Sequence, residues 1–140
     1  MHLLLELSNE LKTLNKTISN SSNNSDTKNK RLLADKGTKL IPVCIDNIAF
    51  IYTQNKISYI VEHNNEKSSI NLPLSELFKT LDKSIFYRAS RQVIISAKAI
   101  DKIEKYGSTQ LKILTNPISP INIFISKNKL TDFKKWIGAN

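Results

Sequence analysis

The stretch LIPVCIDNIAFIYTQNKISYIVEH, residues 40–63, determines the fold class. It holds three short runs rich in β-branched residues, 40–45, 48–53 and 57–63, and the last two are separated only by the polar loop Gln54-Asn55-Lys56. Short runs of this composition, divided by turn residues, are typical of antiparallel strands, and a short polar loop between two of them predicts a hairpin. We therefore predict a mainly β domain that begins at Leu40.

The same pattern continues toward the C-terminus, interrupted by one short helix. Pro73 precedes the apolar positions Leu74, Leu77 and Leu81, whose spacing predicts a helix that covers the sheet. Further strands are predicted at 68–72, 86–90, 92–96, 100–106, 109–114 and 121–125.

The C-terminus predicts a second helix. Its apolar face would be formed by Leu130, Phe133 and Ile137, with Ser126 in an N-cap position and Gly138 placed to end it.

The residues before Leu40 have a different character. The pattern of residues 1–18 predicts an amphipathic helix, because apolar residues recur there at alternating steps of three and four. Such a helix is either part of a preceding domain, a helix packed on this one, or a short dimerising coiled coil. We expect residues 19–39 to form a flexible polar linker, since the stretch 19–30 has no apolar side chain to bury. The apolar helix positions are Leu4, Leu7, Leu11, Leu14 and Ile18.

The composition indicates a basic chain without a membrane segment. The 140 residues contain 21 Lys and Arg against 12 Asp and Glu, a net charge of +9, and 14 of the basic residues against 8 acidic ones lie from Leu40 onward. Such a charge favours polyanionic partners. No apolar run is long enough to span a membrane and no secretion signal is recognisable, so we expect a cytoplasmic location.

No catalytic or metal-binding arrangement stands out. His2 and His63 lie far apart in sequence, and the single cysteine, Cys44, occupies an apolar run typical of a small core side chain. The three glycines form neither a GxGxxG motif nor a P-loop. The sequence therefore predicts no enzyme, no metal site and no cofactor.

Three phrases resemble the LytTR family of DNA-binding domains over residues 40–138. They are LIPVCIDNIAFIY at 40–52, FYRASRQVIIS at 86–96, and ISKNK at 125–129 followed by FKKWI at 133–137. The resemblance implies an elongated stack of small antiparallel sheets with one short internal helix and a C-terminal helix. It also implies sequence-specific reading of two successive major grooves by loop side chains, as the transcription-regulating output domain of a two-component response regulator.

The resemblance also implies a set of DNA-contacting residues. Arg91 matches a base-contacting position, and its planar guanidinium can donate two hydrogen bonds to guanine. Lys127 matches a second position, where Arg is usual, and there phosphate binding competes with base reading. In the loop after residue 53, Asn55 could read adenine and Lys56 could reach guanine or phosphate. The second-tier contacts are Ser90, which replaces the usual His or Asn, Gln92 and Lys129.

Two other groups of residues favour structural roles. Arg88 would lie on the opposite face of its strand from Arg91, and we expect it to be a buried arginine paired with a carboxylate. Aromatic side chains could in principle stack on unpaired bases, which would favour RNA, but we expect them to be core or sheet residues. They are Tyr52, Tyr59, Tyr87, Tyr106 and Trp136.

The partners that follow are double-stranded DNA with repeated promoter sites, a second copy of the chain on that DNA, and an upstream receiver domain or sensor kinase, with no membrane. The alternative is a basic β-rich module that binds a protein, RNA or an anionic membrane surface.

Overall fold

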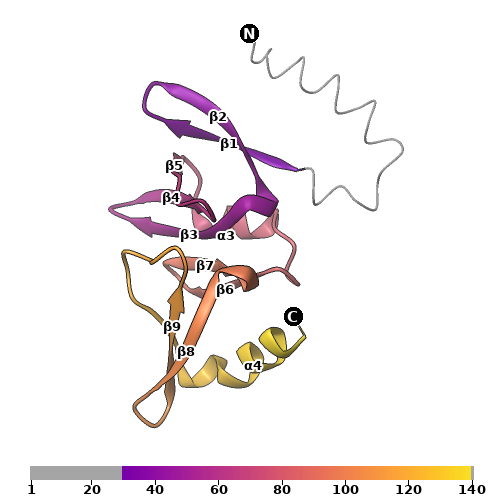
Figure 1. Cartoon of the computed structure of the whole chain (residues 1–140), viewed down its shortest axis with the longest axis vertical. Coiled ribbons are helices and arrows are strands. Elements are labelled where there is room, and N and C mark those ends of the chain that lie inside the picture. The colour runs from indigo at the N-terminus through magenta and orange to yellow at the C-terminus, as the bar shows by residue number, and fades with distance from the viewer. Residues whose placement is uncertain (1–29, 140) are drawn as a thin grey trace, which may run out of the picture.

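The computed structural model describes residues 30–139, so the predicted helix at 1–18 and most of the polar segment after it lie outside the described residues. The described chain forms two antiparallel sheets and few helices, elongated along one axis (Figure 1). The predicted mainly β fold with a short internal helix and a C-terminal helix is confirmed.

The larger sheet has seven strands in the order β2-β1-β5-β4-β3-β7-β6, and every neighbouring pair is antiparallel. Its strands are β1 (Arg31–Lys36), β2 (Lys39–Cys44), β3 (Ile48–Gln54), β4 (Ile57–Glu62), β5 (Lys67–Ile70), β6 (Phe86–Ser90) and β7 (Val93–Ser96). The helix α3 (Leu74–Lys79) lies between β5 and β6 in sequence and packs on the sheet through Leu74 and Leu77.

The smaller sheet has the order β10-β9-β8, with β8 (Ile100–Tyr106), β9 (Gln110–Thr115) and β10 (Ile123–Ile125). Short 3-10 turns lie at η2 (Ile45–Asn47), η3 (Ala97–Ala99) and η4 (Lys127–Lys129). The helix α4 (Leu130–Gly138) ends the fold, and Phe133 is its fully buried residue. Ser126 precedes η4 instead of α4 and makes no side-chain cap, so the predicted cap is displaced by one 3-10 turn.

The predicted flexible linker at 19–39 is wrong in its second half, where residues 31–36 form the strand β1. Residues 31–36 pair along their whole length with β2, and Ala34 is completely buried. Gly37 has a positive φ of 64°, which permits the tight turn between Lys36 and Lys39. The run RLLADK has only two large apolar side chains and becomes a strand through its pairing with β2 and its contact with β5.

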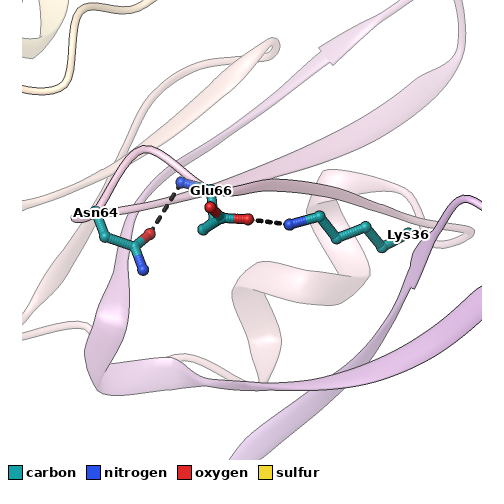
Figure 2. Close-up of polar contacts among 3 residues, drawn as sticks. All are labelled: Lys36, Asn64 and Glu66. Carbon is teal, nitrogen blue, oxygen red and sulfur yellow. Dashed lines mark hydrogen bonds and ion pairs between the residues drawn. The ribbon is translucent and has the colours of Figure 1, made fainter.

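An ion pair holds the tip of this hairpin against the sheet. The Lys36 ammonium contacts the Glu66 carboxylate in the turn between β4 and β5, and the Glu66 N–H donates to Asn64 Oδ1 at 2.9 Å (Figure 2). Both charged side chains are about half exposed, so the pair contributes little to stability on its own. The pair links the β1–β2 hairpin, which projects at one end of the long axis (Figure 1), to the turn between β4 and β5.

The central strand β3 is buried on both faces. Phe50 and Tyr52 belong to a core shared with the smaller sheet and α4, whereas Ile48 and Ile51 belong to a second core shared with α3. This explains why IAFIY is a continuous apolar run instead of an alternating one. Two small cores therefore meet across β3 and its neighbour β7, whose residues divide in the same way.

We predict that Phe133→Ala lowers the free energy of unfolding by about 3–5 kcal/mol, because it opens a cavity in the core that joins α4 to both sheets. The neighbouring exposed substitution Lys134→Ala should change it by less than about 0.5 kcal/mol. Urea unfolding of both variants measures the difference. Equal values for the two would show that α4 does not pack as described.

Candidate nucleic-acid interface

The turn between β3 and β4 presents two of the predicted contact residues. Asn55 and Lys56 are its two central residues, both exposed, with φ values of 54° and 67°. Positive φ at both positions is the signature of a type I′ turn, whose twist matches that of the paired strands. The pair Gln54 and Ile57 closes the turn, so the Lys56 side chain projects from a short, well-defined hairpin.

A second turn, between β6 and β7, presents Ser90, Arg91 and Gln92. The Gln92 N–H donates to Ser90 Oγ at 3.1 Å, and both Arg91 and Gln92 are exposed. The Thr53 N–H at the end of β3 donates to the Gln92 carbonyl at 2.9 Å. This hydrogen bond holds the two turns side by side at the same end of the sheet.

The Arg88 side chain holds the turn at 90–92 through hydrogen bonds to its backbone. Its Nε donates to the Ser90 carbonyl and its Nη2 to the Arg91 carbonyl, both at 3.3 Å. The predicted carboxylate partner is wrong: within residues 30–139, no Asp or Glu pairs with Arg88. The reason is local, since the turn that follows β6 brings two backbone carbonyls within reach of the half-buried guanidinium.

The 3-10 turn η4 contacts the same strand. Lys129 Nζ donates to the Arg88 carbonyl at 2.8 Å and lies 5.7 Å from the centre of the Tyr87 ring. Burial, and next the positive charge of Arg88, lower the pKa of the Lys129 ammonium. The structure therefore turns Lys129 inward, where it positions η4, and leaves Lys127 exposed on the same turn.

The start of α4 is held by a polar and aromatic cluster. The Tyr87 hydroxyl donates to Asp132 Oδ2 at 2.9 Å, and its ring meets Phe133 edge to face at 5.3 Å between centroids. Burial, followed by the Asp132 hydrogen bond, raises the pKa of the Tyr87 hydroxyl well above its usual range. In the chain, Lys127 lies between β10 and α4. Both elements are anchored in the core, through Ile125 and Phe133, so the backbone position of Lys127 is set from both sides.

Most of the aromatic side chains are committed to contacts within the chain. Tyr52 is buried and stacks on Tyr59 at 5.2 Å, and Trp136 Nε1 donates to the Lys83 carbonyl at 3.0 Å. Tyr106 is half exposed and contacts Phe124 at 4.9 Å between ring centroids. The arrangement contains no row of free rings within the described residues on which bases could stack.

An open groove of about 390 Å³ lies between the two turns and the start of α3. Its basic side chains are Lys56, Arg88 and Arg91, so residues from two predicted contact regions face one hollow. Asn55, Ser90, Gln92 and Lys127 do not line it. The full lining comprises Thr53, Lys56, Ser58, Asn71, Leu72, Pro73, Leu74, Ser75, Arg88 and Arg91.

Two polar residues of this groove, Asn71 and Ser75, are not among the site residues predicted from the sequence. Both flank Pro73, and in the sequence they read as the end of a strand and the start of a helix. Nothing in the local sequence indicates a binding role for these two residues. They come to lie beside the turn at Asn55 and Lys56 because β5 pairs with β4. Their amide and hydroxyl groups add hydrogen-bonding capacity to the positive charge.

Two further properties concern the described part of the chain only. Between residues 30 and 139, no group of three or more His, Cys, Asp or Glu side chains could hold a metal ion. No helix in that range is long and apolar enough to cross a membrane.

These features define a basic β-sheet domain that presents its polar side chains on tight turns, and comparison with known proteins identifies the class. The family model of the LytTr DNA-binding domain matches residues 38–138. The chain therefore belongs to the LytTR family of DNA-binding domains, as its sequence phrases indicate.

Solved and curated relatives agree with this assignment. A LytTr DNA-binding domain from Bacillus cereus superposes with a TM-score of 0.68 at 17% identity, covering 78% of this chain and 97% of that one, which shows the shared fold. The transcriptional regulatory protein LytR of Staphylococcus aureus strains N315 and USA300 is 30% identical over 107 residues. That match covers 70% of this chain and 42% of the relative, so the chain spans less than half the length of these proteins.

We predict that Arg88→Ala lowers the free energy of unfolding by about 1 kcal/mol, because two charged hydrogen bonds to the turn carbonyls are lost. Arg91→Ala is the matched control: the same truncation on an exposed side chain should change stability by less than about 0.5 kcal/mol. Urea unfolding separates the two. A larger loss for Arg91→Ala would reverse the roles assigned to the two arginines.

Proposed function

We propose that this domain binds double-stranded DNA sequence-specifically through turn side chains that enter successive major grooves. The observation that carries the proposal is the hydrogen bond between Thr53 and Gln92, which fixes two exposed basic turns at one end of the sheet. Arg91 and Lys56 thereby face one open groove from two different turns. Fixed, pre-positioned side chains bind with a smaller entropic cost than mobile ones.

The residues would divide into base readers and phosphate contacts. Arg91 is exposed and supported from behind by Arg88, so its guanidinium is free to form a two-pronged contact with guanine. Asn55 and Lys56 would reach the bases or backbone beside it, and Ser90 and Gln92 would supply secondary polar contacts. Lys127 would bind a phosphate or base in the adjoining groove.

For Lys129 we propose a supporting role in place of the predicted DNA contact. Its ammonium already donates to the Arg88 carbonyl, so we propose that it orients η4 and Lys127 instead of meeting DNA directly. Placing one cation behind another also concentrates positive charge at this end of the sheet.

The biological setting follows by analogy with the relatives. The matched Staphylococcus aureus proteins are named transcriptional regulatory proteins, and we propose that this chain supplies the output function of a cytoplasmic response regulator. In that setting a receiver domain or sensor kinase would control DNA binding, and two copies would occupy repeated promoter sites.

A mobility-shift titration on promoter fragments, with random DNA as competitor, tests the proposal. We expect selective retention that weakens steeply with salt, by a slope of about 0.9 in log affinity against log salt for each phosphate neutralised. Equal affinity for every duplex would reject sequence-specific binding. Preference for single-stranded RNA or for anionic vesicles over duplex DNA would favour the corresponding alternative partner.

Arg91→Ala should cost about 1–3 kcal/mol of specific binding and relax the preference at one base pair. Lys127→Ala should cost less and weaken specific and random DNA by similar factors, because a phosphate contact carries little sequence information. Binding measured to a matched set of single-base variants distinguishes the two. If Arg91→Ala weakened all sequences equally, the residue would be a phosphate contact.

A further inference from the structure

Within residues 30–139, the strand β8 forms a free edge of the smaller sheet, since it pairs there only with β9. It is seven residues long, and six of its residues, Asp101 through Tyr106, are exposed. An edge strand of this length leaves a row of backbone N–H and C=O groups available for pairing with another strand. Ile103 and Tyr106 are 40% and 51% exposed, so part of the edge is apolar as well.

In the sequence of this edge, IDKIEKY, residues at equal distances on either side of Ile103 carry opposite charges or are both apolar. In an antiparallel pair of two β8 strands centred on Ile103, each Lys102 lies opposite Glu104 of the other copy. Each Asp101 lies opposite Lys105, and each Ile100 lies opposite Tyr106. Every charged residue thus meets the opposite charge and every apolar residue meets an apolar one, which is the cross-strand pairing that stabilises antiparallel sheets.

We propose that β8 is a self-association edge, at which two copies of this chain join their three-stranded sheets into one six-stranded antiparallel sheet. The pairing is isologous, because the same strand is used by both copies around a two-fold axis at Ile103. The proposal rests on the edge alone and does not depend on DNA binding.

The charge pattern also selects the register. Sliding one strand by one residue sets Asp101 opposite Glu104 in one direction and Lys102 opposite Lys105 in the other. Sliding by two residues sets either Glu104 opposite Glu104 or Lys102 opposite Lys102. Parallel pairing in register sets every charge opposite itself. Like charges directly opposite are destabilising. Among the antiparallel registers that pair at least five residues of each strand, only the one centred on Ile103 sets no like charges opposite each other.

The middle of the strand carries the interaction. Asp101 is the extra residue of a bulge between Ile100 and Lys102, which disturbs regular pairing at that end. Lys102, Ile103 and Glu104 lie beyond the bulge in regular register with β9. The inner pair between Lys102 and Glu104 is therefore the one to test.

The edge is separate from the candidate nucleic-acid interface. None of the groove residues belongs to β8, and the turns at 54–57 and 90–92 lie on the larger sheet. A symmetric dimer through β8 would therefore carry two copies of the interface, one for each half-site of a DNA site with two-fold symmetry.

Sedimentation velocity of the full 140-residue chain without DNA, at concentrations raised to about 1 mM, tests the proposal. We expect a reversible shift from 15.9 kDa to twice that mass. Lys102→Glu and Glu104→Lys, each alone, place two pairs of like charges in the dimer and should weaken it by about tenfold or more. Lys135→Glu on α4 makes the same charge change as Lys102→Glu at an exposed site elsewhere and should leave the dimer intact.

The decisive experiment is rescue. Mixing the Lys102→Glu chain with the Glu104→Lys chain restores both attractive pairs, so the mixture should dimerise like the original protein. The double variant carrying both changes in one chain should dimerise as well. A chain that stays monomeric throughout the concentration range, or a dimer that survives both single reversals, would overturn the proposal, as would failure of the mixture to recover.

Failure of this proposal is distinguishable from failure of the proposed function. The reversal variants should still retain a DNA fragment that carries a single site, because the groove residues are untouched. Loss of self-association with retained single-site binding supports both proposals.

Discussion

Burial of β3 and β7 on both faces is the constraint on which the rest of the structure depends. Each strand sends side chains from its two faces into two separate cores, one closed by α3 and the other by the smaller sheet and α4. The alternation is interrupted once in β3, where an irregularity between Ile48 and Phe50 places Ala49 and Phe50 in the same core. A one-residue slip of either strand would exchange the two sets of side chains, so the register is strongly determined. The exposed turns begin at the ends of these strands, so their positions are fixed by the same register.

The candidate interface is therefore a consequence of packing as much as of charge. The Thr53 N–H near the end of β3 donates to the carbonyl of Gln92 in the turn just before β7, so the two turns are tied to strands that are fixed in the core. Arg88 extends it further, with its guanidinium holding one turn and its carbonyl holding Lys129 of η4. Three loops that are distant in sequence thus acquire one common support, as expected of a binding site built on a rigid scaffold.

The outer strands of the two sheets have different surroundings. In the larger sheet, β2 belongs to the hairpin that the contact of Lys36 with Glu66 links to the turn between β4 and β5, and β6 lies next to β10 of the smaller sheet. In the smaller sheet, β8 keeps an exposed side whose charges alternate in sign. Alternating charges discourage pairing with unrelated edges while permitting one partner of matching pattern, so the same residues can limit aggregation and select a partner.

The sequence by itself determined the strand-rich class, the hairpin around Asn55, both helices and the family, because periodicity, turn residues and short phrases are local signals. Only the tertiary structure decided that residues 31–36 form a strand. Their sequence has few of the apolar and β-branched residues that favour strands, and their hydrogen-bonded pairing with β2 and β5 stabilises the strand instead. It also decided the partner of Arg88 and the inward direction of Lys129. Those choices depend on carbonyl groups exposed by a particular turn and on strands brought together across the sheet, and no local pattern encodes either.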